Sequence, residues 1–191
     1  MGAAMTRSCK MLGLLSYATL STAASECVAH ANGLPPPAYN IAAQRSGIPP
    51  DILFAVALQE SGISIRGQRL PWPWTLNIAG RAHYFASYNE ACLSLRTALV
   101  MHPAFRIDAG LTQINLGHQR RFYREPCELL HPRKNLAVAA TLLSEQHRSG
   151  EDWLTAAGRF HRPTGGPLAT RYQRLVRRHL DKLKQPEGNR P

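Results

Sequence analysis

The sequence predicts one all-α domain that carries at most a small β-hairpin. Apolar residues recur at helical spacing in several segments, prolines and glycines separate these segments, and only one segment has the pattern of a hairpin. The chain has 191 residues, of which 44% are hydrophobic, and this is the size and composition of a single globular domain.

Two helices are expected at the start of this domain. A short helix over residues 41–45 ends at Gly47, and Pro49-Pro50-Asp51 places proline and an acid where a second helix begins. The second helix extends to about Ser61 and has no polar face, so we expect it in the middle of the core. Its apolar residues are Ile52, Leu53, Phe54, Val56 and Leu58.

The middle of the chain combines the expected hairpin with a third main helix. Residues 70–84 place apolar and aromatic residues on both sides of Ala79-Gly80, which is the pattern of a small hairpin. Ser87 and Glu90 have the spacing of a capping box, and they predict a helix over residues 91–101.

The remainder of the domain is expected to be helical. Residues 108–115 contain a glycine and two carboxamides and are predicted to form a loop or short turn, which leads into a helix near residues 119–123. Three sets of apolar residues at helical spacing predict three more helices. The sets are Leu136, Ala139, Ala140 and Leu143; Trp153, Ala156, Ala157 and Phe160; and Tyr172, Leu175, Val176 and Leu180.

The first residues of the chain have the three parts of an export signal. Arg7 and Lys10 precede an apolar run over residues 11–20, small residues follow, and the run is too short to span a membrane. The pattern of small residues allows cleavage after Ala24 or after Ala31, and we prefer the later position. We therefore expect a periplasmic protein.

The chain is accordingly divided into four parts. A signal peptide (1–31) is followed by a linker (32–38), a single domain (39–184) and a disordered tail (185–191). The prolines of residues 33–37 exclude a helix in that stretch, so the domain is expected to start near Tyr39.

Removal of the signal peptide changes the cysteine count. Cleavage after Ala31 removes Cys9 and Cys27 and leaves Cys92 and Cys127 as an even pair. This pair is a candidate disulfide in an oxidising compartment, and two unrelated buried thiols are an equally good reading of the sequence.

The excess of positive charge predicts an anionic partner. The formal net charge is +11, and the positive residues are concentrated after Arg159. Nucleic acid and an acidic envelope polymer both fit this charge, but export favours the polymer. An ordinary solvated helix explains the basic run over residues 171–184 more simply than DNA binding does, so no specific nucleic acid is expected.

Glu60 is the candidate residue for acid catalysis. It lies at the end of an apolar helix, on the same stripe as Val56 and Ile52. The negative helix end and partial burial both disfavour a charged carboxylate, so the pKa of Glu60 is expected to be raised. The alternative is a solvated glutamate in a fraying last turn, followed by Gly62 as an ordinary C-cap.

Three motifs in order resemble the soluble lytic transglycosylase family, whose fold is lysozyme-like. The motifs are Gln59-Glu60-Ser61-Gly62; then Asp108-Ala109-Gly110-Leu111-Thr112-Gln113-Ile114-Asn115; and finally Ala156-Ala157-Gly158-Arg159-Phe160-His161, followed by Tyr172. The resemblance extends from about residue 41 to residue 180 and is closest to small single-domain members that serve secretion or conjugation systems.

The resemblance implies roles for individual residues. Glu60 is the catalytic acid, Ser61 supports the glutamate or the substrate, and Gln113 and Asn115 lie near the sugar. Phe160 stands in place of the tyrosine whose hydroxyl contacts the catalytic glutamate in the family, and it has no hydroxyl. Two further residues complete the implied substrate-binding set. These are His161, in place of an asparagine, and Tyr172.

The activity implied is cleavage of the MurNAc-GlcNAc β-1,4 bond of peptidoglycan, with formation of 1,6-anhydro-MurNAc. Two alternatives stay open, namely a hydrolase similar to goose-type lysozyme and an inactive peptidoglycan-binding scaffold protein. We expect a monomer whose partners are glycan strands and components of a secretion or conjugation apparatus. No cofactor is expected, and the histidines show no zinc-ligand spacing.

Aromatic residues before and within the expected hairpin have two readings. They form either a wall on which sugar rings stack or part of the packing of the hairpin. These residues are Trp72, Trp74, Tyr84 and Phe85.

Overall fold

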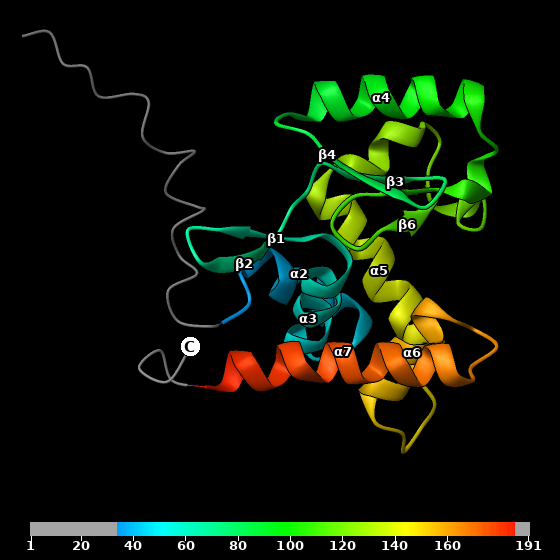
Figure 1. Ribbon diagram of the computed structural model, residues 1–191. Helices are drawn as coiled ribbons and strands as arrows, with labels where there is room; N and C mark the ends of the chain where they lie inside the picture. The colour runs from blue at the N-terminus through cyan, green and yellow to red at the C-terminus, as the bar shows by residue number, and fades with distance from the viewer. Residues whose placement is uncertain (1–33, 186–191) are drawn as a thin grey trace, which may run out of the picture.

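The structure is a computed structural model, and it describes residues 34–185 (Figure 1). The expected signal peptide (1–31) lies outside the described residues, as does the expected tail beyond Gln185. In Figure 1, α4 lies above the strands β3, β4 and β6, whereas α7 runs along the opposite end of the molecule beside α6.

Six α-helices form most of the described chain, and four of them begin with proline. Proline suits the first helical position because its missing N–H has no partner there. The helix α2 begins at Pro37, inside the stretch expected to be non-helical, for this reason. No described helix is both long and apolar enough to cross a membrane. The helices are α2 (Pro37–Ser46), α3 (Pro50–Ser61), α4 (Tyr88–Met101), α5 (Pro132–Gln146), α6 (Trp153–His161) and α7 (Pro167–Lys184).

The expectation of an all-α fold is wrong, because six short strands form two sheets. One sheet is a hairpin of β1 and β2, and the other has the order β4-β3-β5-β6. Only the β3–β4 hairpin was expected, and it turns at Ala79-Gly80 as predicted. The strands are β1 (Gly62–Ile65), β2 (Gln68–Pro71), β3 (Thr75–Ile78), β4 (Arg81–Tyr84), β5 (Ile107–Ala109) and β6 (Ile114–Asn115).

The segment over residues 108–115 was expected to be a loop and is in fact part of the larger sheet. It contributes β5 and β6, which are three and two residues long. Strands of this length are too short to show the alternation of apolar and polar residues that identifies a strand. The helix expected near residues 119–123 is a single 3-10 turn over Arg120–Phe122.

The helix α3 lies in the centre of the core, as its apolar composition predicts. All seven residues from Ile52 to Leu58 are buried, and the helix packs against α7, α2 and β2. The core continues into one face of the larger sheet, where Leu76, Ile107, Ala109 and Ile114 are buried. The polar face of this sheet is therefore its opposite face.

A buried asparagine joins α5 to the turn between β5 and β6. The side-chain Nδ2 of Asn135 donates to the carbonyl oxygens of Ala109 (2.9 Å) and Leu129 (2.8 Å). Its Oδ1 accepts from the backbone N–H (2.9 Å) and the hydroxyl (2.6 Å) of Thr112. All four hydrogen-bonding positions of the amide are used, so this buried polar side chain is fully satisfied.

Gly110 makes room for this asparagine. Its φ is +82°, and a Cβ at this position would lie 2.3 Å from Asn135 Nδ2 and 2.5 Å from the carbonyl oxygen of Leu129. The backbone conformation and the close approach both require glycine. The Gly-Leu-Thr-Gln stretch is thus fixed by packing against α5.

We predict that Asn135→Ala lowers the free energy of unfolding by at least about 3 kcal/mol, because it leaves several buried groups without a hydrogen-bond partner. Asn77→Ala is the matched control, since the buried Oδ1 of Asn77 has no hydrogen-bond partner. Urea unfolding of both variants measures the difference, and equal losses would contradict the assigned role of Asn135.

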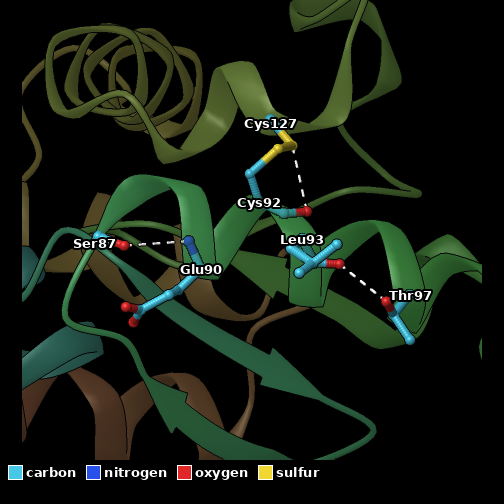
Figure 2. The surroundings of a disulfide bond; sticks show 6 residues. All are labelled: Ser87, Glu90, Cys92, Leu93, Thr97 and Cys127. Atoms are coloured by element: carbon cyan, nitrogen blue, oxygen red, sulfur yellow. Dashed lines mark hydrogen bonds between the residues drawn. A yellow bond between two sulfur atoms is a disulfide. The ribbon is translucent and has the colours of Figure 1, made fainter.

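A disulfide between Cys92 and Cys127 fixes α4 to the turn η3 (Pro126–Leu130) (Figure 2). The hydroxyl of Ser87 accepts from the N–H of Glu90, which is the first bond of the expected capping box. The carboxylate of Glu90 accepts from the N–H of Ala86, the residue before Ser87, so the second bond is shifted by one residue. The helix is therefore held at its first turn and along one side.

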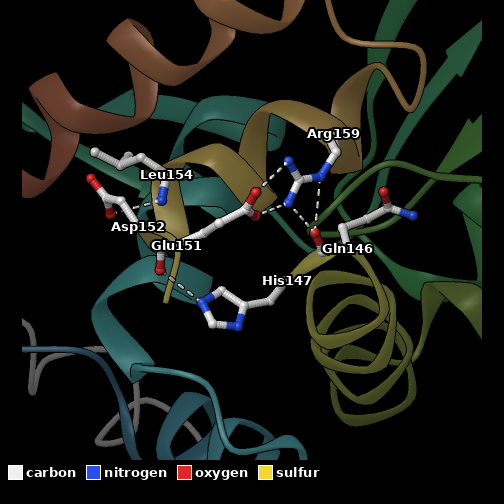
Figure 3. Close-up of polar contacts among 6 residues, drawn as sticks. All are labelled: Gln146, His147, Glu151, Asp152, Leu154 and Arg159. Carbon is white, nitrogen blue, oxygen red and sulfur yellow. Dashed lines mark hydrogen bonds and ion pairs between the residues drawn. The ribbon is translucent and has the colours of Figure 1, made fainter. Parts of the chain in front are cut away.

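Arg159 fixes α6 against the end of α5 (Figure 3). Its guanidinium donates to the carbonyl oxygen of Gln146 from Nη2 (2.6 Å) and Nε (3.0 Å), and it forms an ion pair with Glu151. His147 stacks on Trp153 with 3.8 Å between the ring centroids. These contacts position the last residues of α6, including two of the predicted site residues.

Candidate active site

Glu60 forms a hydrogen bond with a residue far along the chain. It is the penultimate residue of α3 and is partly buried. The hydroxyl of Tyr172, a buried residue of α7, donates to Oε1 of Glu60 over 2.6 Å. Two helices that are far apart in the sequence therefore meet at this carboxyl group.

Burial raises the pKa of Glu60 from its ordinary 4.5 to about 7. The negative charge of Asp108 also raises this pKa, whereas the hydrogen bond from Tyr172 lowers it. A carboxyl group with a pKa near 7 is protonated in a large fraction of molecules at neutral pH, which suits a general acid.

The alternative of a solvated glutamate in a fraying turn is wrong. Gly62 does not form a left-handed C-cap, since its φ is −65° and it begins β1. A Cβ on Gly62 would lie 2.3 Å from the carbonyl oxygen of Leu58 and 2.6 Å from Nε of Arg69. The end of α3 is therefore tightly packed.

The hydroxyl that contacts Glu60 comes from Tyr172. The resemblance implied that it would come from the position that Phe160 occupies. Phe160 is partly buried and packs against the core. The interpretation that Phe160 leaves the glutamate without a tyrosine partner is therefore wrong. Sequence reasoning assigned Tyr172 to substrate binding, because the motif that includes this tyrosine does not show that its hydroxyl contacts Glu60.

His161 orients the ring of Tyr172. The two rings are stacked, with 4.4 Å between centroids and 5° between planes. Partial burial and the neighbouring Arg162 lower the pKa of His161, which favours the neutral imidazole at neutral pH. A second contact between α3 and α7 joins His179 Nε2 and Gln59 Oε1 over 3.3 Å.

Ser61 connects α3 to the second motif. Its hydroxyl is fully buried and lies 2.7 Å from the carbonyl oxygen of Leu111 and 3.2 Å from that of Ala57. The serine therefore supports the position of Glu60 from inside the core, and its buried hydroxyl is already engaged with backbone.

Gln113 and Asn115 lie beside the same turn, and their carboxamides contact the protein. Gln113 has a φ of +47°, and its Nε2 donates to the carbonyl oxygens of Gly110 (2.8 Å) and Thr75 (3.2 Å). Asn115 Nδ2 donates to Oδ1 of Asp108 over 2.8 Å. Both side chains thus stabilise the local fold of the site.

Three polar residues form a row across the larger sheet. Asn77 is paired with Asp108, and Asp108 is paired with Asn115, so all three side chains project from one face. The hydrogen bond from Ser61 to Leu111 joins the end of α3 to the turn of this sheet, and the charge of Asp108 raises the pKa of Glu60. Sequence reasoning missed Asn77. The only indication in the sequence is that Asn77 occupies a polar position in the alternating polar and apolar pattern of residues 75–78.

Asp108 is itself partly protected from water. Burial raises its pKa, and the hydrogen bond from Asn115 and the charge of His118 oppose this shift. Glu60 and Asp108 are thus two carboxyl groups in one site, and both have raised pKa values. Among residues 34–185, no group of three or more His, Cys, Asp or Glu side chains is arranged to hold a metal ion.

The two tryptophans before the β3–β4 hairpin contact one another and the protein. Their rings meet edge to face with 5.9 Å between centroids. The indole N–H of Trp72 donates to the carbonyl oxygen of Phe85 over 2.7 Å, and Trp74 packs against the core. Both rings are partly exposed, and Tyr84 is exposed at the sheet edge.

The arrangement of a central helix that ends in a glutamate, beside a small sheet with a polar face, is that of a lysozyme-like domain. The family described as the transglycosylase SLT domain matches residues 37–165, and the chain belongs to this family. Its members are lytic transglycosylases, and the family implies peptidoglycan as the substrate. No curated protein and no solved structure matches the chain.

We predict that Glu60→Gln stabilises the protein in a pH-dependent manner. The folded pKa lies above the unfolded one, so the stabilising contribution of protonated Glu60 is complete below pH 4.5 and is lost as pH rises through about 7. Glutamine avoids this loss, so the variant is more stable by about 3 kcal/mol at pH 8 and by little at pH 4. Thermal unfolding at both pH values measures the gap, and a constant gap would show that burial of the charged carboxylate is not its cause.

Proposed function

We propose that the chain is an exported lytic transglycosylase that cleaves the MurNAc-GlcNAc β-1,4 bond and forms 1,6-anhydro-MurNAc. The observation that carries the proposal is the pair of Glu60 and Tyr172. Burial gives the carboxyl group of Glu60 a pKa of about 7, and the hydrogen bond from Tyr172 over 2.6 Å fixes its orientation. This site lies within a chain that belongs to a family of such enzymes.

Protonated Glu60 starts the reaction as a general acid. It donates its proton to the oxygen that joins the two sugars, and this proton transfer makes the oxygen a better leaving group. The N-acetyl group of the substrate stabilises the positive charge that develops at C1 of MurNAc. The bond between C1 and the leaving oxygen then breaks, and Glu60 becomes a carboxylate.

The same residue then acts as a base. The Glu60 carboxylate removes the proton from the C6 hydroxyl of MurNAc, and the C6 oxygen attacks C1 to close the 1,6-anhydro ring. Glu60 is protonated again at the end of the cycle, and no water enters the product. The hydrogen bond from Tyr172 stabilises the carboxylate between the two steps.

Other residues of the site act through position and hydrogen bonding. Gln113 and Asn115 lie on the turn beside Glu60, and we assign them contacts with the sugar in addition to their bonds within the protein. Phe160 contributes an apolar surface, and His161 holds the ring of Tyr172. Ser61 keeps the end of α3 against this turn.

The proposal places the enzyme in the periplasm, where peptidoglycan is accessible. The N-terminal sequence pattern supports export, and the disulfide suits an oxidising compartment. A role in opening the wall for a secretion or conjugation apparatus rests on the resemblance to small single-domain family members. Retention of the full chain in the cytoplasm during fractionation would argue against this location.

Asp108 supports one alternative, a hydrolase of the goose-type lysozyme kind. A second carboxylate beside the acid is the arrangement that activates water in inverting glycosidases. The inactive scaffold is the other alternative, and its support was the departure from the family motif at Phe160 and His161. Tyr172 supplies a hydroxyl to Glu60, so the departure at Phe160 no longer favours the scaffold.

Digestion of purified sacculi tests the proposal directly. We predict that residues 32–191 release fragments that end in 1,6-anhydro-MurNAc, as measured by mass spectrometry. The Glu60→Gln variant is expected to release none, because its side chain cannot donate and recover a proton. Fragments heavier by one water would assign the hydrolase, whereas binding without release by the wild type would assign the scaffold.

We predict opposite shifts in the pH profile for two substitutions beside Glu60. Activity requires protonated Glu60, so the rate of sacculus clearing falls as pH rises through the pKa near 7. Tyr172→Phe removes a hydrogen bond that lowers this pKa, so the fall moves to higher pH. Asp108→Asn removes a charge that raises it, so the fall moves to lower pH.

The readout is the pH at which the rate of sacculus clearing falls to half of its maximum. This pH can be compared between variants even if their maximal rates differ. Shifts in the same direction for both variants would contradict the electrostatic assignment. Complete loss of activity in Asp108→Asn would favour the hydrolase, in which the second carboxylate takes part in the chemistry.

A further inference from the structure

A groove of about 880 Å³ lies between α4 and the β3–β4 hairpin, apart from the Glu60 site. The strand β4 contributes Arg81 and His83 to its lining, and α4 contributes Leu93 and Met101. We refer to it as the α4 groove. Alternate residues of a strand point to opposite faces, so Arg81 and His83 face away from the row that contains Asp108.

One wall of the α4 groove is a free sheet edge. The order of the larger sheet is β4-β3-β5-β6, so β4 pairs on one side only, and all four of its residues are exposed. A strand with an open edge presents unpaired backbone groups to any extended chain that can align with it.

The hairpin register identifies which backbone groups are free. The turn has two residues, Ala79 and Gly80, with φ values of +51° and +88°, so the Ile78–Arg81 pair that closes it is hydrogen-bonded. Hydrogen-bonded and non-hydrogen-bonded pairs alternate along the two strands. The N–H and C=O groups of Ala82 and Tyr84 belong to non-hydrogen-bonded pairs and therefore point outward. An added strand would meet up to four backbone hydrogen-bonding groups.

The other wall is apolar and exposed. Leu93 is 70% exposed and Met101 is 72% exposed, although both are large hydrophobic residues. Burial of such side chains by a partner removes apolar surface from water and so stabilises a complex. Phe85 and Ile78 extend this apolar lining toward the sheet.

The groove is already formed without a partner. The disulfide of Cys92 and Cys127 fixes the side of α4 that carries Cys92, and the capping box of Ser87 and Glu90 fixes its start (Figure 2). A rigid groove costs little entropy when it binds, because no large segment has to become ordered.

Charge identifies the chemistry of the occupant. Arg81 lines the groove as a cation, and the chain as a whole has a formal net charge of +11. Glu90 is the only acidic residue of the lining, and its carboxylate already accepts a hydrogen bond from Ala86. An acidic segment is therefore favoured over a basic one.

We propose that the α4 groove binds an extended acidic segment of a partner protein, which adds as a strand beside β4. Every second side chain of the segment faces the groove, and among these side chains apolar ones pack on Leu93 and Met101 and a carboxylate pairs with Arg81. Its backbone pairs with Ala82 and Tyr84 over about 13 Å of strand. The proposal does not depend on the chemistry at Glu60.

Selection from a phage-displayed library of random linear dodecapeptides, panned against residues 32–191, tests this proposal. Enriched peptides are expected to carry apolar residues and an acidic residue on the same face, that is, at positions separated by two or four residues. A synthetic enriched peptide is expected to lose at least tenfold in affinity for Leu93→Asp. The matched control is Val100→Asp, because Val100 is 83% exposed on the same helix but does not line the groove.

N-methylation of the peptide distinguishes strand addition from general adhesion. Methyl groups on alternate amides, those that face β4, are expected to abolish binding, whereas methyl groups on the other amides leave it intact. Hydrogen exchange at Ala82 and Tyr84 is expected to slow at least tenfold in the complex. Sacculus clearing by Leu93→Asp serves as a folding control and is expected to be unchanged.

Four results in the peptide experiments would overturn the proposal. These are the absence of enriched peptides, equal binding to Leu93→Asp and Val100→Asp, insensitivity to the position of the methyl groups, and competition by soluble glycan fragments. The last of these would assign the groove to a polysaccharide. Concentration-dependent dimerisation that Leu93→Asp abolishes would also overturn it, since a second copy would then occupy the groove.

Discussion

The domain depends on one buried set of hydrogen bonds that joins its helices to its larger sheet. Ser61 contacts the carbonyl oxygen of Leu111, and Asn135 contacts the next residue, Thr112, together with two carbonyl groups. Glu60 immediately precedes Ser61, so the same set of bonds fixes the acid relative to the sheet. Few water molecules can replace these bonds, because all the side chains involved are fully buried. The position of the site is therefore a property of the core.

Local signals in the sequence were sufficient to predict most of the helices. The end of α3 at Ser61 and the capping box before α4 were predicted, because each depends on a few neighbouring residues. The strands β5 and β6 were missed, because strands of two and three residues have no period to detect. The start of α2 at Pro37 was also missed, since proline at the first helical position needs no N–H and does not end a helix there.

The candidate site could be predicted only in part. The raised pKa of Glu60 follows from its position on an apolar helix, which is visible in the sequence. The hydrogen bond from Tyr172 and the contribution of Asn77 depend on how distant segments pack, and no local pattern records this packing. Family motifs directed attention to Phe160, whereas the hydroxyl comes from another helix. A motif identifies positions in a chain, but hydrogen-bond partners are set in three dimensions.

The contact between Glu60 and Tyr172 joins residues that are 112 positions apart, and Tyr172 lies beyond the matched residues 37–165. This contact forms only when α7 packs against α3. Until α7 docks, water surrounds the carboxyl group and its acidity is that of an ordinary glutamate. A chain in which α7 has not packed against α3 therefore lacks both the burial that raises this pKa and the hydroxyl that orients the carboxyl group. The acid and the residue that orients it come from opposite ends of the domain, so the site is assembled only when these two helices are in contact.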